Sequence, residues 1–258
     1  MVRKVESGIT GLDEMLRGGF PEGRMILIIG GPGTGKTILC SQFLYHGATR
    51  QEKTVYISLD ETKSHFLEEM LTFGWNFQEL EQDNVFTFID ASSIRRIPEE
   101  AKVGKLQVAG KELARERLKD SIFKTLDESG QLMDRALGDL GAQRIVLDSI
   151  SGLTFRFPDA REKRQAMLDI MEALNGIGAT CLITSEAISI GEERQVQPEE
   201  YLSHGAVLLQ TLGTGERAVR IVKMRGTEVD STPRPYKIGQ TGLEVYPGQN
   251  LYQTRATY

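Results

Sequence analysis

The chain has 258 residues, of which 40% are hydrophobic and 26% are charged, and its formal net charge is −5. This composition is ordinary for a soluble globular protein with a substantial core, and no apolar stretch reaches the length of a membrane span. A net negative charge argues against nucleic-acid binding through a generally basic surface, although it leaves room for a local basic patch.

The N-terminal residues are charged and lack the apolar core of a signal peptide, so a cytoplasmic protein is expected. Two cysteines, Cys40 and Cys181, each fall inside a predicted core element and show no metal-ligand spacing. Reduced thiols are therefore favoured over a disulfide, which agrees with that location.

Strand-like runs alternate with helical segments through the first two thirds of the chain. The sequence predicts strands over residues 26–29, 55–59, 85–89, 144–147 and 180–184. It predicts helices over residues 37–47, 63–73 and 161–175. Such alternation favours a parallel sheet with helices on its faces.

The last third of the chain changes character. Residues 206–210 and 218–223 flank glycines at 213 and 215, which predicts a hairpin, and residues 236–238 and 243–245 predict another antiparallel pair. We therefore expect an α/β fold in which a mainly parallel sheet, flanked by helices, ends in antiparallel C-terminal hairpin strands. Residues 1–258 are expected to form a single domain.

The segment 92–143 is long for a connection. Residues 95–108 are polar and weakly periodic, which predicts a loop. From residue 111 onward apolar residues recur at helical spacing, which predicts one or two amphipathic helices broken near Gly130. The mixed charges of these helices are explained more simply by a solvated face than by a partner-binding surface.

Residues 30–37 read Gly-Gly-Pro-Gly-Thr-Gly-Lys-Thr between a predicted strand and a predicted helix, which fits the motif G-x-x-x-x-G-K-[ST]. Glycines let backbone N–H groups approach phosphate oxygens, and the helix start adds partial positive charge. Lys36 would contact the β- and γ-phosphates, and Thr37 would offer its hydroxyl to Mg²⁺. A glycine-rich turn before an ordinary helix is the alternative, and the preceding strand argues against it. We predict a nucleoside triphosphate site formed by Gly31, Pro32, Gly33, Thr34, Gly35, Lys36, Thr37 and Ile38.

Hydrolysis would need carboxylates beyond this loop. Asp148 ends a predicted strand, where ligand groups gather in open α/β sheets, so we expect it to face Thr37 and help hold Mg²⁺; a helix N-cap is the alternative. Asp60 and Glu61 close the strand after the loop's helix, and either can orient or deprotonate the attacking water. Their alternative role is a charge pair at a helix N-terminus.

Two further positions carry polar groups at strand ends. Ser185, with Glu186, follows the strand 180–184, where a polar group can sense the γ-phosphate, unless it belongs to a simple turn. Lys223 and Arg225, in Lys-Met-Arg-Gly, form a cationic pair at the end of a C-terminal strand. Surface solvation explains this pair, and so does a cation supplied to the phosphates across a subunit interface.

Several motifs in their order along the chain make a family recognisable. They are Ser-Gly-Ile-Thr-Gly-Leu-Asp-Glu-Met-Leu at 7–16, Gly-Gly-Phe-Pro-Glu-Gly at 18–23, the glycine-rich loop, Asp-Glu at 60–61, Phe-Gly-Trp at 73–75, Val-Leu-Asp-Ser at 146–149, Thr-Ser-Glu at 184–186 and Lys-Met-Arg-Gly at 223–226. Over nearly its whole length the chain resembles the KaiC-like branch of the RecA/DnaB superfamily, particularly its single-domain archaeal and bacterial members.

The resemblance implies a RecA-type P-loop NTPase fold that binds ATP with Mg²⁺. It also implies a homo-oligomer, usually a hexameric ring with ATP at the subunit interfaces, in which Lys223 and Arg225 reach the neighbour's nucleotide. The family usually carries consecutive glutamates where this chain has Asp60 and Glu61, so Glu61 is the safer catalytic candidate and slow turnover is expected. Glu200 and Tyr201 stand where the clock protein of the family carries phosphoacceptors, so autophosphorylation and a clock function are not expected.

The leading hypothesis is a slowly hydrolysing, Mg²⁺-dependent ATPase that forms a ring and acts as a regulatory switch on a protein partner that the sequence does not identify. A DNA-dependent recombinase-like ATPase is a second hypothesis, with nucleic acid held by loops 151–164 and 187–198. These loops carry Phe155, Arg156, Phe157 and Arg194, but their acidic residues dilute the charge. A non-hydrolysing ATP-binding scaffold is the third hypothesis, and Asp60 is the feature that favours it.

Overall fold

The computed structural model describes residues 2–90, 141–155, 159–187, 189–190 and 193–251. The loop and helices predicted between residues 92 and 143 therefore lie outside the described residues, except for the last few. No helix in the described ranges has the length and apolar character that crossing a membrane requires.

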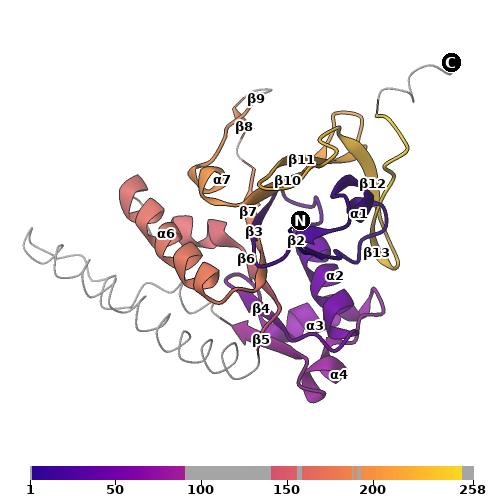
Figure 1. Cartoon of the computed structure of the whole chain (residues 1–258), viewed down its shortest axis with the longest axis vertical. Helices are drawn as coiled ribbons and strands as arrows, with labels where there is room; N and C mark the ends of the chain where they lie inside the picture. The colour runs from indigo at the N-terminus through magenta and orange to yellow at the C-terminus, as the bar shows by residue number, and fades with distance from the viewer. Residues whose placement is uncertain (1, 91–140, 156–158, 188, 191–192, 252–258) are drawn as a thin grey trace, which may run out of the picture.

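A sheet of nine strands runs through the described part of the molecule, in the order β13-β12-β11-β10-β3-β7-β6-β4-β5 (Figure 1). Its strands are β3 (Met25–Gly30), β4 (Thr54–Ser58), β5 (Phe86–Asp90), β6 (Arg144–Asp148), β7 (Thr180–Glu186), β10 (Gly205–Thr211), β11 (Arg217–Met224), β12 (Arg234–Gly239) and β13 (Gly242–Val245). Neighbours from β10 to β5 are parallel. β11, β12 and β13 extend one edge in antiparallel pairs. The predicted α/β fold with antiparallel C-terminal strands is confirmed.

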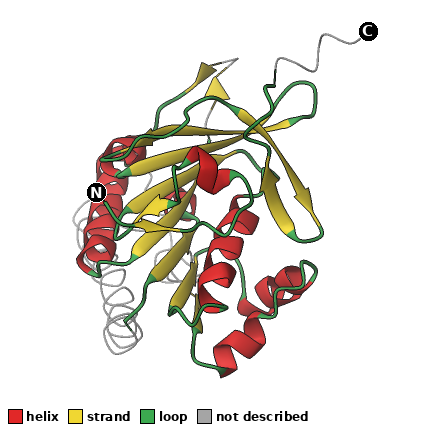
Figure 2. Cartoon of the chain, turned by 45° about the vertical axis from the view of Figure 1, so that its right-hand side comes forward, coloured by secondary structure: helices red, strands yellow, loops and turns green. Residues whose placement is uncertain are grey.

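Helices cover both faces of this sheet (Figures 1 and 2). On one face lie α2 (Lys36–Ala48), α3 (Lys63–Leu71) and α4 (Phe77–Gln82), and on the other lies α6 (Ala160–Gly176). The central strands are apolar on both faces, as buried parallel strands must be. On β3, for example, Ile26 and Ile28 join the core under α2, whereas Leu27 and Ile29 join the core under α6.

The short elements of the structure were not predicted. They are β1 (Lys4–Val5), α1 (Leu12–Met15), β2 (Phe20–Pro21), the 3₁₀ helix η4 (Ile150–Phe155), β8 (Ser189–Ile190), β9 (Glu193–Arg194) and α7 (Pro198–Leu202). The helix predicted over 63–73 is α3, which ends at Leu71. Gly74 then turns the chain with a φ of 77°, and the Asn76 side chain caps α4 by accepting a hydrogen bond from the Glu79 N–H.

Parallel strands bring their carboxyl ends to one edge of the sheet. The glycine-rich loop leaves β3 at this edge, and Asp148 and Glu186 end the neighbouring strands β6 and β7 there. β4 lies on the other side of β6 and ends at Ser58, just before the two predicted acidic residues. The fold therefore gathers most of the predicted polar positions at one place.

Candidate nucleotide-binding site

The glycine-rich loop has the backbone geometry that the motif predicts. Gly33 and Gly35 have φ values of 72° and 88°, in the left-handed region that glycine adopts without a Cβ penalty. Lys36 is the first residue of α2, and no side chain caps the helix at Gly35. The N–H groups of the first turn, which includes Thr37 and Ile38, are therefore directed to whatever anion lies above them.

Lys36 folds back over this loop. Its Nζ donates to the carbonyl oxygens of Gly30 at 2.9 Å and Gly31 at 3.1 Å. Partial burial lowers the pKa of Lys36, while the charges of Asp148 and Glu186 act to raise it. The ammonium group thus lies at the mouth of the loop, between the ends of β3, β6 and β7.

The Asp148 carboxylate accepts hydrogen bonds from hydroxyl groups of different elements. Thr37 Oγ1 and Tyr56 Oη each donate to Oδ2 at 2.7 Å, and Thr184 Oγ1 donates to Oδ1. The predicted meeting of Asp148 with Thr37 is thus present in the structure. An adjacent hydroxyl and carboxylate are oxygen donors of the kind that Mg²⁺ prefers, so these two residues fit the predicted cation.

Tyr56 and Thr184 were not predicted at this site. Tyrosine and threonine are common in strands for packing reasons, so their type alone carries no functional signal. Only the pairing of β6 with β4 on one side and β7 on the other brings both hydroxyls to Asp148. Burial, followed by the charge of Asp148, raises the pKa of Tyr56 well above its usual value, so this phenol stays a proton donor.

The two acidic residues after β4 differ in their surroundings. Glu61 is half-buried, and its backbone is fixed by Ser58, whose Oγ donates to the Glu61 carbonyl at 2.6 Å and accepts from its N–H at 2.8 Å. Burial raises the pKa of Glu61, and the charges of Glu69 and Asp148 raise it further. Asp60 is exposed. The Asp148 charge therefore acts on Glu61.

Ser185 does not contact Asp148. Side chains alternate along a strand, and β7 continues to Glu186, so Thr184 and Ser185 point to opposite faces. Thr184 meets Asp148, whereas Ser185 is buried on the α6 side and donates to Glu199 Oε1 at 2.9 Å. Thr184 is therefore the residue of this pair that contacts Asp148, and the role of Ser185 towards the γ-phosphate stays a prediction.

Lys223 and Arg225 lie towards the amino ends of the parallel strands, whereas the glycine-rich loop lies at their carboxyl ends. On β10, Leu209 pairs with Gly30 beside the loop. Towards the other end of β10, Ala206 pairs with Lys223 of the antiparallel strand β11. Ala206 and Leu209 are separated by about 10 Å along β10. Neither cation approaches the loop of its own chain.

Backbone carbonyls near α7 hold this cationic pair. Lys223 Nζ donates to the Ser203 carbonyl at 2.6 Å, and Arg225 Nη2 donates to the Tyr201 carbonyl at 3.1 Å. Partial burial and the charge of Arg225 lower the pKa of Lys223, and Glu200 acts to raise it. The two side chains are therefore supported by α7, which was itself not predicted.

The last two strands contact the glycine-rich loop. The buried hydroxyl of Tyr236, on β12, donates to the Thr34 carbonyl at 2.6 Å, and burial raises the pKa of Tyr236 to about 12. Ile238 lies over Gly35 so closely that a Cβ there would be 2.6 Å from Ile238 Cδ1. Because Cδ1 is the end of a side chain that can shift, the positive φ of Gly35 is the stronger reason why position 35 favours glycine.

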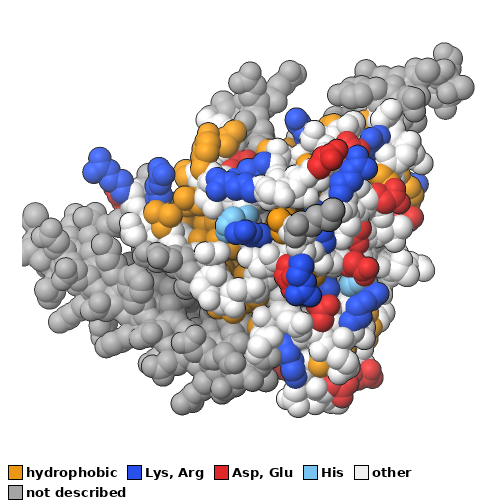
Figure 3. Space-filling view, in the orientation of Figure 1, with side chains coloured by type: hydrophobic (Ala, Val, Ile, Leu, Met, Phe, Trp, Pro, Cys, Tyr) orange, Lys and Arg blue, Asp and Glu red, His pale blue; other side chains and the backbone are white. Residues whose placement is uncertain are grey.

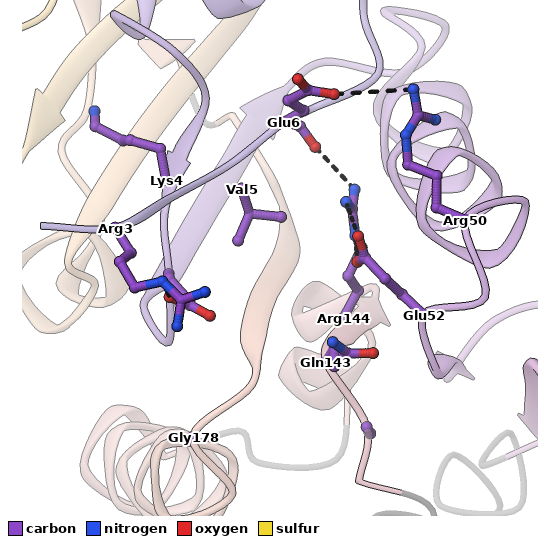
Figure 4. Close-up of a pocket in the computed structure, with 11 residues that line it drawn as sticks. Arg3, Lys4, Val5, Glu6, Arg50, Glu52, Gln143, Arg144 and Gly178 are labelled. Carbon is purple, nitrogen blue, oxygen red and sulfur yellow. Dashed lines mark hydrogen bonds and ion pairs between the residues drawn. The ribbon is translucent and has the colours of Figure 1, made fainter.

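A cavity of about 410 Å³ lies at the amino ends of the strands, away from the loop (Figure 4). It is built around the buried Arg144, which donates to Glu52 and to the carbonyls of Glu6 and Phe43. Arg3 and Arg50 also line it, and each forms an ion pair with a glutamate. Its charges are mixed, and it shares no residue with the glycine-rich loop.

Part of the predicted nucleic-acid surface lies outside the described residues. This applies to Arg156 and Phe157 and to the side chains of Phe155 and Arg194.

The fold and this loop define a RecA-type P-loop protein. A family model described as "ATPase: KaiC" matches residues 5–250. The chain is 33% identical over 259 residues to UPF0273 protein PF1931 of Pyrococcus furiosus, spanning 99% of this chain and 98% of that protein. It is 34% identical over 255 residues to UPF0273 protein MJ1359 of Methanocaldococcus jannaschii, spanning 97% and 99%. KaiC-like protein PH0186 from Pyrococcus horikoshii has a similar crystal structure, with a TM-score of 0.76, 30% identity and coverage of 96% of this chain and 100% of that one.

The chain therefore belongs to the KaiC ATPase family, which confirms the resemblance found in the sequence. Membership supports ATP as the nucleotide and ATP hydrolysis as the class of activity.

Proposed function

We propose that this chain, as one domain over residues 1–258, is a slow Mg²⁺-dependent ATPase that forms a ring and acts as a regulatory switch. The observation that carries the proposal is the 2.7 Å contact between Thr37 Oγ1 and Asp148 Oδ2 beside the glycine-rich loop. By donating its proton to Asp148, the Thr37 hydroxyl keeps its lone pairs for a cation. Bound Mg²⁺ would neutralise charge on the β- and γ-phosphates.

The remaining roles follow from position and charge. Residues 31–38 form the phosphate cradle, in which every residue except Pro32 can donate a backbone N–H, and Lys36 leaves its carbonyl partners to contact the phosphates. Glu61 orients or deprotonates the attacking water, because its pKa is raised towards the range where a carboxylate acts as a base. Exposed Asp60, in place of the family's usual glutamate, supports slow turnover.

Lys223 and Arg225 act on the nucleotide of a neighbouring chain in this proposal. Their place at the far edge of the sheet supports this, because they cannot serve their own loop. Tyr201, whose carbonyl Arg225 contacts, is 68% exposed, and Val196, just before α7, is 53% exposed. Figure 3 shows hydrophobic and Lys or Arg side chains gathered over the region of α7 and β10, a composition that suits an interface.

A subunit-mixing experiment tests the proposal. Lys36→Ala removes a charged contact to the phosphates and should weaken ATP binding by about 10- to 100-fold. Arg225→Ala should bind ATP normally but hydrolyse it poorly. An equal mixture should regain up to about a quarter of wild-type activity, because some interfaces then pair an intact loop with an intact Arg225.

Lys53→Ala is the matched control, since Lys53 lies at the amino end of β4 and its Nζ donates to the Asn84 carbonyl. It should hydrolyse ATP at the wild-type rate. Normal ATP binding by Lys36→Ala contradicts the nucleotide site, and a mixture that regains nothing contradicts the shared interface. Tight ATP binding without turnover by the wild type would instead favour the scaffold hypothesis, and strong stimulation by single-stranded DNA the recombinase hypothesis.

A further inference from the structure

Tyr56 is buried in the middle of β4 and reaches the end of the neighbouring strand. It is 1% exposed, and its hydroxyl donates to Asp148 Oδ2 at 2.7 Å. Its ring lies 4.4 Å from the ring of Phe66 and stacks at 5.5 Å on Phe88. Aromatic packing on both neighbours therefore fixes where the hydroxyl can be.

The Asp148 carboxylate has few acceptor positions left. An ionised carboxylate offers about four lone-pair positions, two on each oxygen. The hydroxyls of Thr37 and Tyr56 occupy positions on Oδ2, and the hydroxyl of Thr184 occupies one on Oδ1. About one position then remains, which is enough for a single water molecule of a cation's hydration shell.

We propose that Tyr56 is a positioning residue for the cation side of this site, holding Asp148 Oδ2 so that the carboxylate presents its one remaining acceptor position, on Oδ1, in a fixed direction. This inference rests on the proposed function. Without the phenol, Oδ2 would lose one of the two side-chain donors that the structure describes for it and keep Thr37. The carboxylate could then rotate about its Cβ–Cγ bond. Phenylalanine would fill the same volume, so the packing with Phe66 and Phe88 does not by itself require a hydroxyl.

The test is Tyr56→Phe, with Tyr45→Phe as the matched control. Tyr45 is a half-buried tyrosine on α2 whose ring packs on Trp75 and Phe77, remote from Asp148. Two affinities are measured: that of Mn²⁺ in the presence of ADP, by electron paramagnetic resonance, and that of a fluorescent ADP analogue in EDTA. Thermal unfolding is recorded for each protein.

Tyr56→Phe should weaken Mn²⁺ binding by about 10- to 100-fold, the usual effect of losing a partner of a metal-site carboxylate. Its affinity for the nucleotide in EDTA should equal that of the wild type, and Tyr45→Phe should match the wild type in both measurements. Unchanged Mn²⁺ affinity in Tyr56→Phe would overturn the inference. So would an equal loss of nucleotide and Mn²⁺ affinity with a lowered unfolding temperature, because that pattern indicates general disruption.

The proposed function is tested separately by the wild type. If the wild type binds the nucleotide but no Mn²⁺ with it, the Mg²⁺ site itself is wrong, and the inference is overturned with it. If the wild type binds both and Tyr56→Phe behaves identically, only the role of Tyr56 fails.

Discussion

The chemistry of the site depends on small differences between neighbouring side chains. Asp60 and Glu61 are adjacent in sequence, yet one is exposed and the other is half-buried within reach of the Asp148 charge. Thr184 and Ser185 are also adjacent, yet they bond to Asp148 and Glu199 on opposite faces of the sheet. At the ends of strands, one residue decides which side chain meets a ligand.

A carboxylate that acts as a base must be deprotonated, so activity should fall as the pH drops through the pKa of Glu61. Burial is the largest cause that raises this pKa, and the charge of Glu69 on α3 is the next. Glu69→Gln should therefore lower the pKa of Glu61 and move the acid limb of the kcat/KM profile to lower pH. The shift should be largest at low ionic strength, where charges are least screened.

The control for this change is Glu68→Gln, which alters the adjacent exposed position of the same helix. Its acid limb should match that of the wild type. If Glu69→Gln leaves the limb where it was, Glu61 is not the group that titrates in the profile.

The glycine-rich motif predicted Thr37 and the strand-end position predicted Asp148, and these two residues meet in the structure. The catalytic roles of Asp60 and Glu61 stay predictions. Motif and strand-end position were not enough for Tyr56 or Thr184, because nothing in a single sequence reveals that β6 lies between β4 and β7. The direction of the Ser185 side chain was not predicted either: the strand was expected to end at residue 184, and its continuation to Glu186 sets the alternation of faces.

Among the elements, those with a long apolar pattern were predicted within a few residues. Elements of a few residues, such as α7 and β1, were missed because they contain less than two turns or a single pair of side chains. The hairpin of β12 and β13 was predicted as a pair, but its position against the glycine-rich loop was not. That position follows from the order of the sheet and from Tyr236 and Ile238.

The contact between this hairpin and the loop should be measurable through Tyr236→Phe. The change removes the donor to the Thr34 carbonyl and leaves a buried acceptor without its partner, which costs about 1–3 kcal/mol. We expect the midpoint of urea unfolding to fall accordingly and the affinity for ATP to weaken, because the loop loses a support.

Tyr246→Phe serves as the comparison, since the Tyr246 hydroxyl bonds to Glu244 at the exposed surface. Its effect on the free energy of unfolding should stay within about 0.5 kcal/mol. Equal effects of the two changes would show that the hairpin does not support the loop.

At the scale of the whole molecule, the two edges of the sheet have different tasks. The carboxyl edge carries the glycine-rich loop and its carboxylates, and the amino edge carries Arg144 with its cavity. Arg144 is 1% exposed and ties α2 and the N-terminal segment to the start of β6. Gly47 faces it so closely that a Cβ would lie 2.4 Å from Arg144 Nε.

Arg144→Met should therefore destabilise the protein by about 3–5 kcal/mol, because it leaves Glu52 and two carbonyl groups without their donor. Urea unfolding measures this. The double variant Arg144→Met with Glu52→Gln should recover part of the loss, since the uncompensated charge is removed.

The exposed pair of Arg3 and Glu22 provides the contrast, because Arg3 is 85% exposed in its side chain. Arg3→Ala should change the free energy of unfolding by at most about 1 kcal/mol. If Arg144→Met costs no more than Arg3→Ala, the amino ends of the strands do not depend on the Arg144 guanidinium group for stability.

Lys223 and Arg225 lie about 10 Å along the sheet from the glycine-rich loop. Each subunit therefore has two different surfaces, one with the loop and one with the cationic pair. In the proposed assembly, the loop surface holds a nucleotide and the cationic pair completes the nucleotide site of the next subunit. An open row of subunits has one nucleotide site that lacks the cationic pair of a neighbour, whereas a closed ring has none. Dilution that opens or dissociates the assembly should therefore lower the turnover per subunit, so that protein concentration alone would regulate the ATPase.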